Sequence, residues 1–176
     1  MNDTELKEVE MAAAKAGKYL TFKIDAEEYG VEILKVKEII GLMNITKVPR
    51  TPAFVRGVIN LRGMVIPVVD LRKKFGMQSI EDTKETCIIV MEIVKNGEPI
   101  SMGILVDAVS EVLDIAGQEI ESTPSFGVEI DMGSILGMAK TKGSVKILLN
   151  IDRVLTEEDI KGIADLKCAL LENEKI

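Results

Sequence analysis

Short runs of alternating or continuous apolar residues dominate the chain from about residue 19 onward. Residues 20–24 alternate apolar and polar side chains, which is typical of a strand with one buried face. Residues 86–94 are almost continuously apolar, which predicts a strand buried on both faces. Similar patterns follow at residues 100–106, 109–115 and 145–149. The pattern predicts a mostly β protein built from short strands.

Turn signals separate these strands. Gly-containing dipeptides between apolar runs predict β-hairpins at residues 62–63, 96–97 and 142–143. Pro67 lacks a backbone donor, so part of the second arm of the first hairpin is expected to be a sheet edge or a bulge. The mixed spacing of residues 33–40 predicts one short helical turn followed by a strand.

Helical patterns are confined to short segments and to the two ends. Asp70 is a good N-cap for a short helix over residues 71–75. Thr156 is a good N-cap for a last helix over residues 156–176, because acidic residues fill its first turn. Residues 1–18 form a polar leader whose single thin apolar stripe holds a helix poorly, so this leader is expected to be flexible.

Two pairs of segments resemble each other without gaps. Residues 56–71 align with 136–151, and residues 29–40 align with 102–113. The glycines that fall in register are Gly57 with Gly137, Gly63 with Gly143, and Gly30 with Gly103. A glycine shared at one place in two copies marks a backbone position that needs positive φ or close approach. The alternative is a chance similarity between hydrophobic strands.

The repeat predicts two small barrels of about five strands each, packed together with a groove at their joint. We place the boundary between the two barrels near residue 83, so that they span about 19–83 and 84–155, with an exchange of terminal segments allowed. Together they form one domain over residues 19–155, between the leader and the final helix.

Charge and composition exclude several functional classes. The chain has 22 basic and 29 acidic residues, and its net charge of −7 disfavours binding to nucleic acid. The absence of histidine removes His-based catalytic triads and the usual zinc ligand. Motifs for phosphate-binding loops, dinucleotides and calcium are absent from the sequence. The sequence has no apolar run of about 20 residues and no signal-like start, so a cytoplasmic protein is expected. Neither a cofactor nor a metal ion is expected.

Some apolar residues lie beside charged ones in a way that suits a binding surface. Val36 and Ile39 share a segment with Glu38, and Arg62 lies at a hairpin tip beside apolar neighbours. An apolar groove with one positioned ion pair would suit an amphipathic helix of a partner. The alternative is an ordinary barrel core in which Arg62 is only a turn residue.

Two motifs point to a known family. The sequence GVINLRG at residues 57–63, followed by IPVVDLR at residues 66–72, resembles the chemotaxis coupling protein (CheW) family. Residues 29–31, 33–36, 38–39, 51–55, 106–107 and 109–110 also fit that family's pattern, and the resemblance covers roughly residues 19–155. It implies two five-stranded SH3-like barrels and a non-enzymatic adaptor that links membrane chemoreceptors to the histidine kinase CheA.

The resemblance also implies where partners bind. The receptor's cytoplasmic helical tip would dock in the groove between the barrels, and Glu38 and Arg62 are expected to pair there. The receptor-binding positions carried over are Ile33, Val36, Glu38, Ile39, Gly57, Arg62 and Val112. Glu121 and Phe126 are the candidate contacts with the kinase's regulatory domain. Such a protein is expected in the cytoplasm, recruited to receptor arrays at the inner face of the membrane without inserting into it.

Two other functions are weighed against this one. Small β-barrels can bind nucleic acid, but the charge of −7, the lack of Trp and the few aromatics (two Tyr, four Phe) argue against it. A metal-dependent enzyme without histidine would need an all-oxygen site, for which the sequence shows no arrangement.

Overall fold

The computed structural model describes residues 2–3, 15–78, 80–121, 134–141, 143–156, 158–159 and 162. Most of the predicted leader and final helix, and Phe126, therefore lie outside the described residues. The chain divides into two compact units, residues 1–35 with 109–154 and residues 36–108 with 155–176. Within the described part, no helix is long and apolar enough to cross a membrane.

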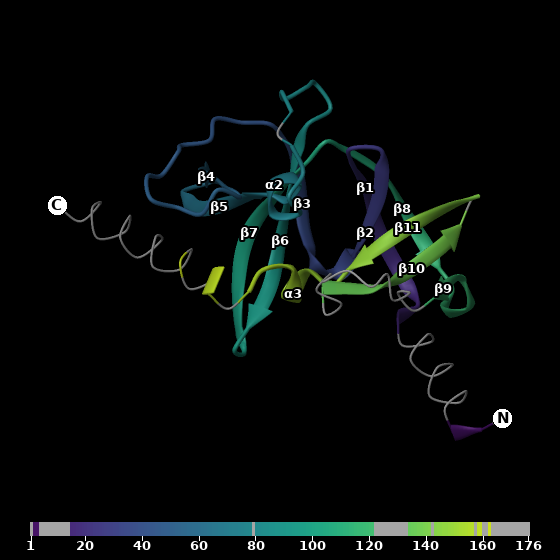
Figure 1. The fold of residues 1–176 in the computed structure, drawn as a ribbon. Helices are drawn as coiled ribbons and strands as arrows, with labels where there is room; N and C mark the ends of the chain where they lie inside the picture. The colour runs from purple at the N-terminus through teal and green to yellow at the C-terminus, as the bar shows by residue number, and fades with distance from the viewer. Residues whose placement is uncertain are drawn as a thin grey trace. The chain divides into compact units, whose positions relative to one another are not determined.

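The first unit is built on a six-stranded sheet in the order β8-β1-β2-β11-β10-β9 (Figure 1). Its short helical elements are η1, η2 and α3, and the bounds are β1 Gly17–Ile24, β2 Glu27–Glu32, η1 Ile33–Lys35, β8 Ala108–Ile115, η2 Gly117–Glu119, β9 Ile120–Glu121, β10 Ile135–Thr141, β11 Ser144–Leu149 and α3 Ile151–Val154.

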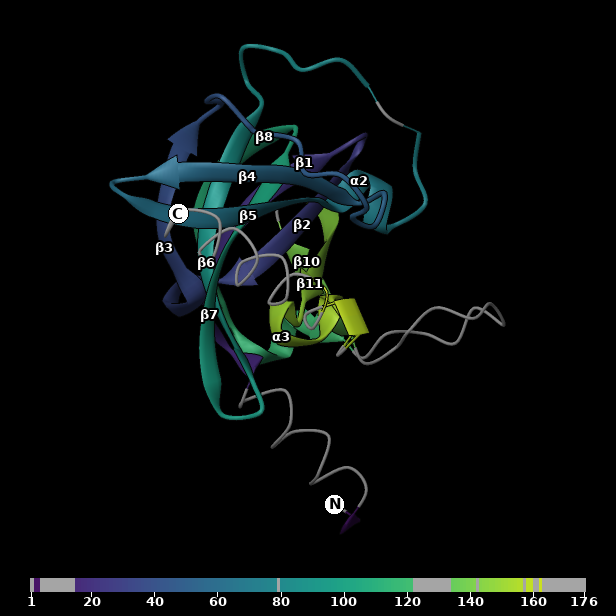
Figure 2. The same ribbon diagram turned by 90° about the vertical axis from the view of Figure 1, so that its left-hand side faces the viewer.

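The second unit is built on a five-stranded sheet in the order β3-β6-β7-β5-β4 (Figure 2). Its elements are β3 Val36–Gly41, β4 Val55–Leu61, β5 Met64–Asp70, α2 Leu71–Lys74, β6 Cys87–Lys95 and β7 Glu98–Val106. The structure confirms the predicted helical turn at residues 33–35 and the strand after it. It also confirms the short helix capped by Asp70, since the Asp70 carboxylate accepts a hydrogen bond from the Arg72 N–H at 3.0 Å.

The two sheets repeat one pattern, as the sequence predicts. In order, β8-β1-β2-β11-β10 corresponds to β3-β6-β7-β5-β4, and the two-residue β9 is the extra strand of the first sheet. The parallel pairs correspond residue by residue, because Gly30 lies opposite Leu148 and Gly103 lies opposite Val68. The mostly β, two-subdomain SH3-like fold is thus confirmed.

The aligned glycines Gly57 and Gly137 mark a β-bulge at the same place in each copy. The pairing register shifts between Val55 and Gly57 in one hairpin and between Ile135 and Gly137 in the other. Next to each bulge, a backbone hydrogen bond joins the two arms of the hairpin at their open end. The Asp70 N–H donates to the Phe54 carbonyl at 2.7 Å, and the Asn150 N–H donates to the Ser134 carbonyl at 2.8 Å.

Position 57 must be a glycine for a steric reason as well. Its φ is +148°, and a Cβ there would lie 2.2 Å from the backbone oxygen of Thr46. Thr46 exchanges two backbone hydrogen bonds with Val58, each 2.9 Å long. The chain before β4 can therefore lie against that strand only where a side chain is absent.

The boundary predicted near residue 83 differs from the observed division. All five strands of the second sheet come from residues 36–106, whereas the first sheet combines residues 17–32 with residues 108–149. The difference arises because β3 pairs with β6 and β5 pairs with β7, so the segment after β2 joins the later strands.

Pro67 lies in the part of β5 that pairs on one side only, because residues 64–67 have a partner in β4 but none in β7. The expectation of a local sheet edge at Pro67 is therefore confirmed. β5 lies between β4 and β7, and Pro67 pairs with Val58 within a regular part of the hairpin. Both backbone groups of Val58 bond to Thr46, so this is a pair without mutual hydrogen bonds. The parallel pairing with β7 starts one residue later, at Val68, so the missing donor costs no ladder bond.

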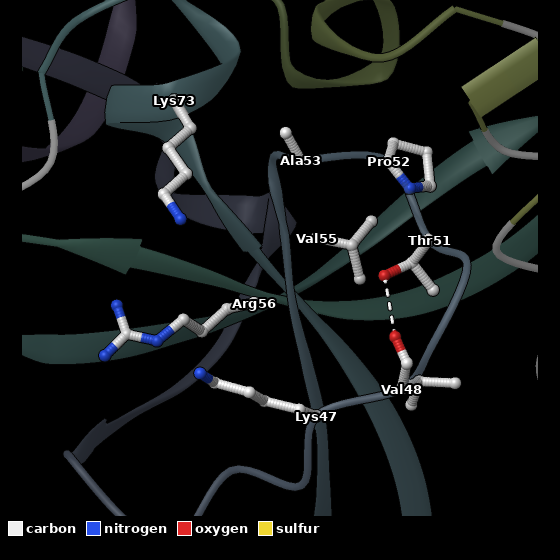
Figure 3. A pocket seen from close by; sticks show the side chains of 8 residues that line it. All are labelled: Lys47, Val48, Thr51, Pro52, Ala53, Val55, Arg56 and Lys73. Carbon is white, nitrogen blue, oxygen red and sulfur yellow. Dashed lines mark hydrogen bonds between the residues drawn. The ribbon is translucent and has the colours of Figure 1, made fainter.

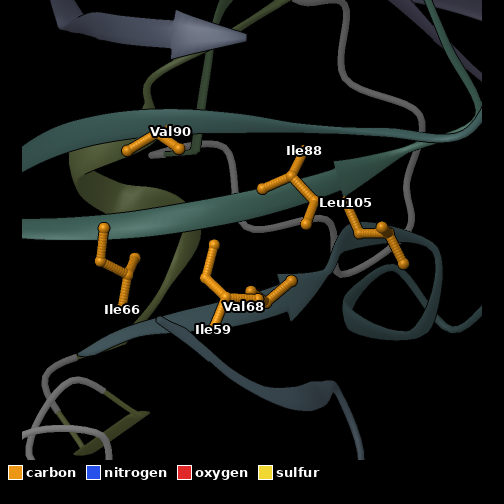
Figure 4. Packing of buried hydrophobic residues seen from close by; sticks show 6 residues of the cluster. All are labelled: Ile59, Ile66, Val68, Ile88, Val90 and Leu105. Carbon is orange, nitrogen blue, oxygen red and sulfur yellow. The ribbon is translucent and has the colours of Figure 1, made fainter. Parts of the chain in front are cut away.

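Each sheet has an apolar core of its own. In the second unit, Ile59, Ile66, Val68, Ile88, Val90 and Leu105 form one buried cluster (Figure 4). In the first unit, Tyr19, Ile115, Ile120, Ala139 and Leu148 form another. Each fully buried aliphatic side chain of this kind contributes about 1.5–3 kcal/mol of transfer free energy.

The start of the final segment is tied to α2. The Thr156 N–H donates to the Asp159 carboxylate at 2.9 Å, and the Asp159 N–H donates back to the Thr156 hydroxyl at 3.1 Å. This reciprocal pair is the geometry of a capping box, which supports Thr156 as a helix N-cap. Lys74 of α2 also donates to Asp159 at 2.7 Å.

Gly57→Ala should be strongly destabilising, because the added Cβ would collide with the Thr46 backbone at a φ that L-residues avoid. We expect a loss of at least about 3 kcal/mol in the free energy of unfolding, measured by urea denaturation. Gly41→Ala is the matched control, because a Cβ there meets no atom within 4 Å, and it should cost less than about 1 kcal/mol. Equal losses in the two variants would contradict the steric explanation.

Candidate functional site

The hairpin between β4 and β5 presents Arg62 at its tip. Arg62 and Gly63 have φ angles of +53° and +85°, which define a tight two-residue turn with both central residues left-handed. The Asn60 side-chain oxygen accepts a hydrogen bond from the Gly63 N–H at 2.9 Å and holds this turn. The Arg62 side chain is 74% exposed, so its position is set by contacts at its guanidinium group.

Glu38 of β3 supplies those contacts. Arg62 donates two hydrogen bonds to the Glu38 carboxylate, at 2.6 and 3.1 Å, one to each oxygen. The Glu38 side chain is 29% exposed. A bidentate pair of this kind fixes the plane of the guanidinium as well as its position. The expected pairing of Glu38 with Arg62 is therefore confirmed.

The pairing with Arg62 changes the pKa of Glu38. Hydrogen bonds from Arg62 lower the pKa of Glu38 below its ordinary value of 4.5, against a smaller opposing effect of desolvation. The pKa of Arg62 is raised in turn, chiefly by its hydrogen bonds to Glu38. Because the pKa of Glu38 is lowered in the folded state, the pairing favours the fold above pH 4.5 and is lost as the pH falls.

A bulge in β3 turns two charged side chains to one face of the sheet. The register with β6 shifts between Val36 and Glu38, so Lys37 is an extra residue. Lys37 donates to the Ser101 hydroxyl at 2.8 Å and lies 3.4 Å from the Glu92 carboxylate, on the face that also carries Glu38. Lys37 was not among the predicted site residues, and strict alternation along the strand would place it on the face opposite Glu38.

Val36 and Ile39 lie on the other face of β3. They pair with Met91 and Ile89, whereas Glu38 pairs with Val90, and directly paired residues point to the same side of a sheet. Ile39 is 45% exposed although it is a large apolar residue. Since β3 is the outermost strand of its sheet, the predicted receptor contacts Val36, Glu38 and Ile39 occupy both faces of one edge strand.

The remaining predicted receptor contacts lie elsewhere. Gly57 is buried against Thr46 in the second unit, so its observed role is to let two backbone segments approach. Ile33, partly buried in η1, and Val112, 50% exposed in β8, belong to the first unit. As contacts of a receptor, all three stay predictions.

One of the two predicted kinase contacts is described. Glu121 lies in the short strand β9, where it pairs with Met138 of β10. Its exposed carboxylate accepts a hydrogen bond from Lys140 at 2.6 Å. Phe126 lies outside the described residues. Among the residues that the structure describes, there is no group of three or more carboxylates or cysteines placed to hold a metal ion.

Arg62→Asn should raise the pKa of Glu38 toward 4.5, because it removes both hydrogen bonds while asparagine tolerates the left-handed turn. Carboxyl-carbon NMR of Glu38 over a pH series measures the change directly. Lys37→Ala, which removes a neighbouring charge that bonds Ser101 and Glu92, should give the smaller shift. A larger shift in Lys37→Ala than in Arg62→Asn would contradict the assigned cause.

Comparison with known proteins agrees with this arrangement. The family model for the CheW-like domain matches residues 18–159. The chain is 37% identical to the chemotaxis protein CheW of Klebsiella aerogenes over 142 residues, covering 81% of this chain and 83% of that protein. It is 35% identical to the chemotaxis protein CheW of Thermotoga maritima over 152 residues, covering 85% and 94%. The crystal structure of the scaffolding protein TtCheW from Thermoanaerobacter tengcongensis is similar with a TM-score of 0.72 and 37% identity, over 82% of this chain and 95% of that one. The chain therefore belongs to the CheW-like family.

Proposed function

We propose that this protein is a non-enzymatic adaptor that couples membrane chemoreceptors to the histidine kinase CheA. The observation that carries the proposal is the exposed, bidentate Glu38–Arg62 pair on the edge strand and hairpin tip of a CheW-like domain. The adaptor would act in the cytoplasm and be recruited to receptor arrays at the membrane. It would need no cofactor.

The edge of β3 suits a helical partner. Ile39 offers exposed apolar surface on one face, and the Glu38–Arg62 pair offers fixed charges on the other. A receptor helix that lies along this strand can therefore contact both kinds of side chain, as amphipathic helices require. Val36, Gly57, Ile33 and Val112 complete the proposed set of receptor-binding positions.

The pair serves orientation more than stability. Exposed ion pairs are screened by solvent and contribute little to stability, so the fold has little need of Arg62. A guanidinium held in one plane by two hydrogen bonds loses less freedom when a partner binds it. This is the property expected of an interface anchor.

A separate surface is proposed for the kinase. Glu121 and Lys140 form an exposed pair on the first unit, and Phe126 follows Glu121 in the sequence. Charged residues at the rim of an interface chiefly affect the rate and salt dependence of association. Glu121 and Phe126 would contact the regulatory domain of the kinase.

Co-sedimentation with receptor-bearing membranes tests the coupling itself. Purified kinase should pellet with the membranes only when this protein is present. The control is membranes without receptors, from which both proteins should stay in the supernatant. Kinase that pellets equally well without this protein would refute the adaptor proposal.

Arg62→Asp should reduce the amount of this protein that pellets with receptor membranes by about tenfold, because it reverses the anchor charge and repels Glu38. Lys84→Asp, an exposed lysine with no ion pair among the described residues, is the charge-matched control and should pellet normally. Circular dichroism checks that both variants fold. Normal pelleting of folded Arg62→Asp would remove Arg62 from the receptor site.

Glu121→Lys should separate the two partners. The substitution reverses the exposed charge at β9, and the new lysine would repel Lys140. Less kinase should therefore pellet, while this protein itself should pellet as before. Loss of both proteins from the pellet would instead place Glu121 in the receptor contact or in the fold.

A further inference from the structure

The second unit carries a pocket of about 380 Å³ that the proposed coupling function does not use. It lies between the segment that leads into β4, β4 itself and α2 (Figure 3). Figure 3 shows the cationic ends of Lys47, Arg56 and Lys73 gathered on one side, and Val48 and Pro52 on the other. The pocket therefore has a basic half and an apolar half. We call it the basic pocket.

The basic half retains unused positive charge. No lining residue is acidic, which is notable in a chain of net charge −7. Arg56 already bonds Asp82 at 2.6 Å and lies 3.9 Å from Asp70. Lys47 and Lys73 are exposed and take part in no ion pair within the described part of the chain. These two lysines are thus the charges that the pocket can offer to a partner.

The walls of the pocket are held in place before any partner binds. The Thr51 hydroxyl donates to the Val48 carbonyl at 3.0 Å, and the Val55 N–H donates to the Pro52 carbonyl at 3.0 Å. Pro49 and Pro52 fix two further φ angles of this wall. Since the apolar half is ordered in advance, binding would cost little conformational entropy.

From this arrangement we infer that the basic pocket binds an acidic peptide segment of a protein partner, with carboxylates at Lys47 and Lys73 and an apolar side chain against Val48 and Pro52. Charge complementarity selects carboxylates, and the apolar half selects a peptide over a small inorganic anion. Asp70 and Asp82, which neutralise Arg56, would repel the dense charge of a phosphate chain or nucleic acid. Carboxylates spaced along a peptide avoid that repulsion.

The test uses the full chain and a fluorescein-labelled peptide of alternating glutamate and leucine, followed by fluorescence anisotropy at low salt. The unmodified protein should bind this peptide, and the variant Lys47→Glu with Lys73→Glu should bind it about tenfold more weakly. The control variant Lys23→Glu with Lys84→Glu has the same net charge but reverses two exposed lysines outside the pocket, and should bind normally. Replacing leucine by serine in the peptide should also weaken binding.

Several results would overturn the proposal. These are absence of binding to the unmodified protein, equal weakening in both variants, and no effect of the leucine-to-serine change. Displacement of the peptide by an equal concentration of inorganic phosphate, or of a single-stranded oligonucleotide, would indicate a general anion site instead. The outcome is independent of the co-sedimentation assay, because the peptide assay includes neither receptor nor kinase.

Discussion

The contact between Gly57 and the backbone of Thr46 is the constraint on which the functional surfaces of the second unit depend. Two hydrogen bonds between Thr46 and Val58 hold the preceding segment against β4, and only a residue without a Cβ can occupy position 57 there. One end of β4 presents Arg56 to the basic pocket, and the other leads to the turn that carries Arg62. A single backbone approach thus sets the direction of two candidate binding surfaces.

Much of the fold follows from the sequence because the relevant signals are local. Hairpins depend on dipeptides such as Asn96-Gly97, and both of these residues have positive φ as a tight turn requires. The repeat could be recognised from glycines because each copy needs them at the same bulge and the same parallel pair. The pairing of Glu38 with Arg62 was anticipated from the family resemblance and is present.

The features that sequence did not predict depend on pairing between distant segments. Nothing in residues 36–41 indicates that β3 joins β6 instead of the strands before it, so the boundary near residue 83 was misplaced. The bulge at Lys37 breaks the alternation that assigns side chains to faces, and its only sign is the partner register. The basic pocket likewise joins residues 47–56 to Lys73 through tertiary structure alone.

The strand order also has a consequence for how the chain is assembled during synthesis. The second sheet consists of one continuous stretch, residues 36–106, inserted into the first sheet between β2 and β8. All of its strands leave the ribosome before any strand from the later half of the first sheet does, because chains emerge from the N-terminus onward. Both edges of the β1–β2 hairpin therefore lack a partner until β8 and β11 arrive. Once the insert has folded, its two ends are held at a fixed separation. This lowers the entropic cost of bringing the two parts of the outer sheet together. The interrupted sheet, and not the inserted one, is the part of the molecule exposed longest to wrong pairing during its own synthesis.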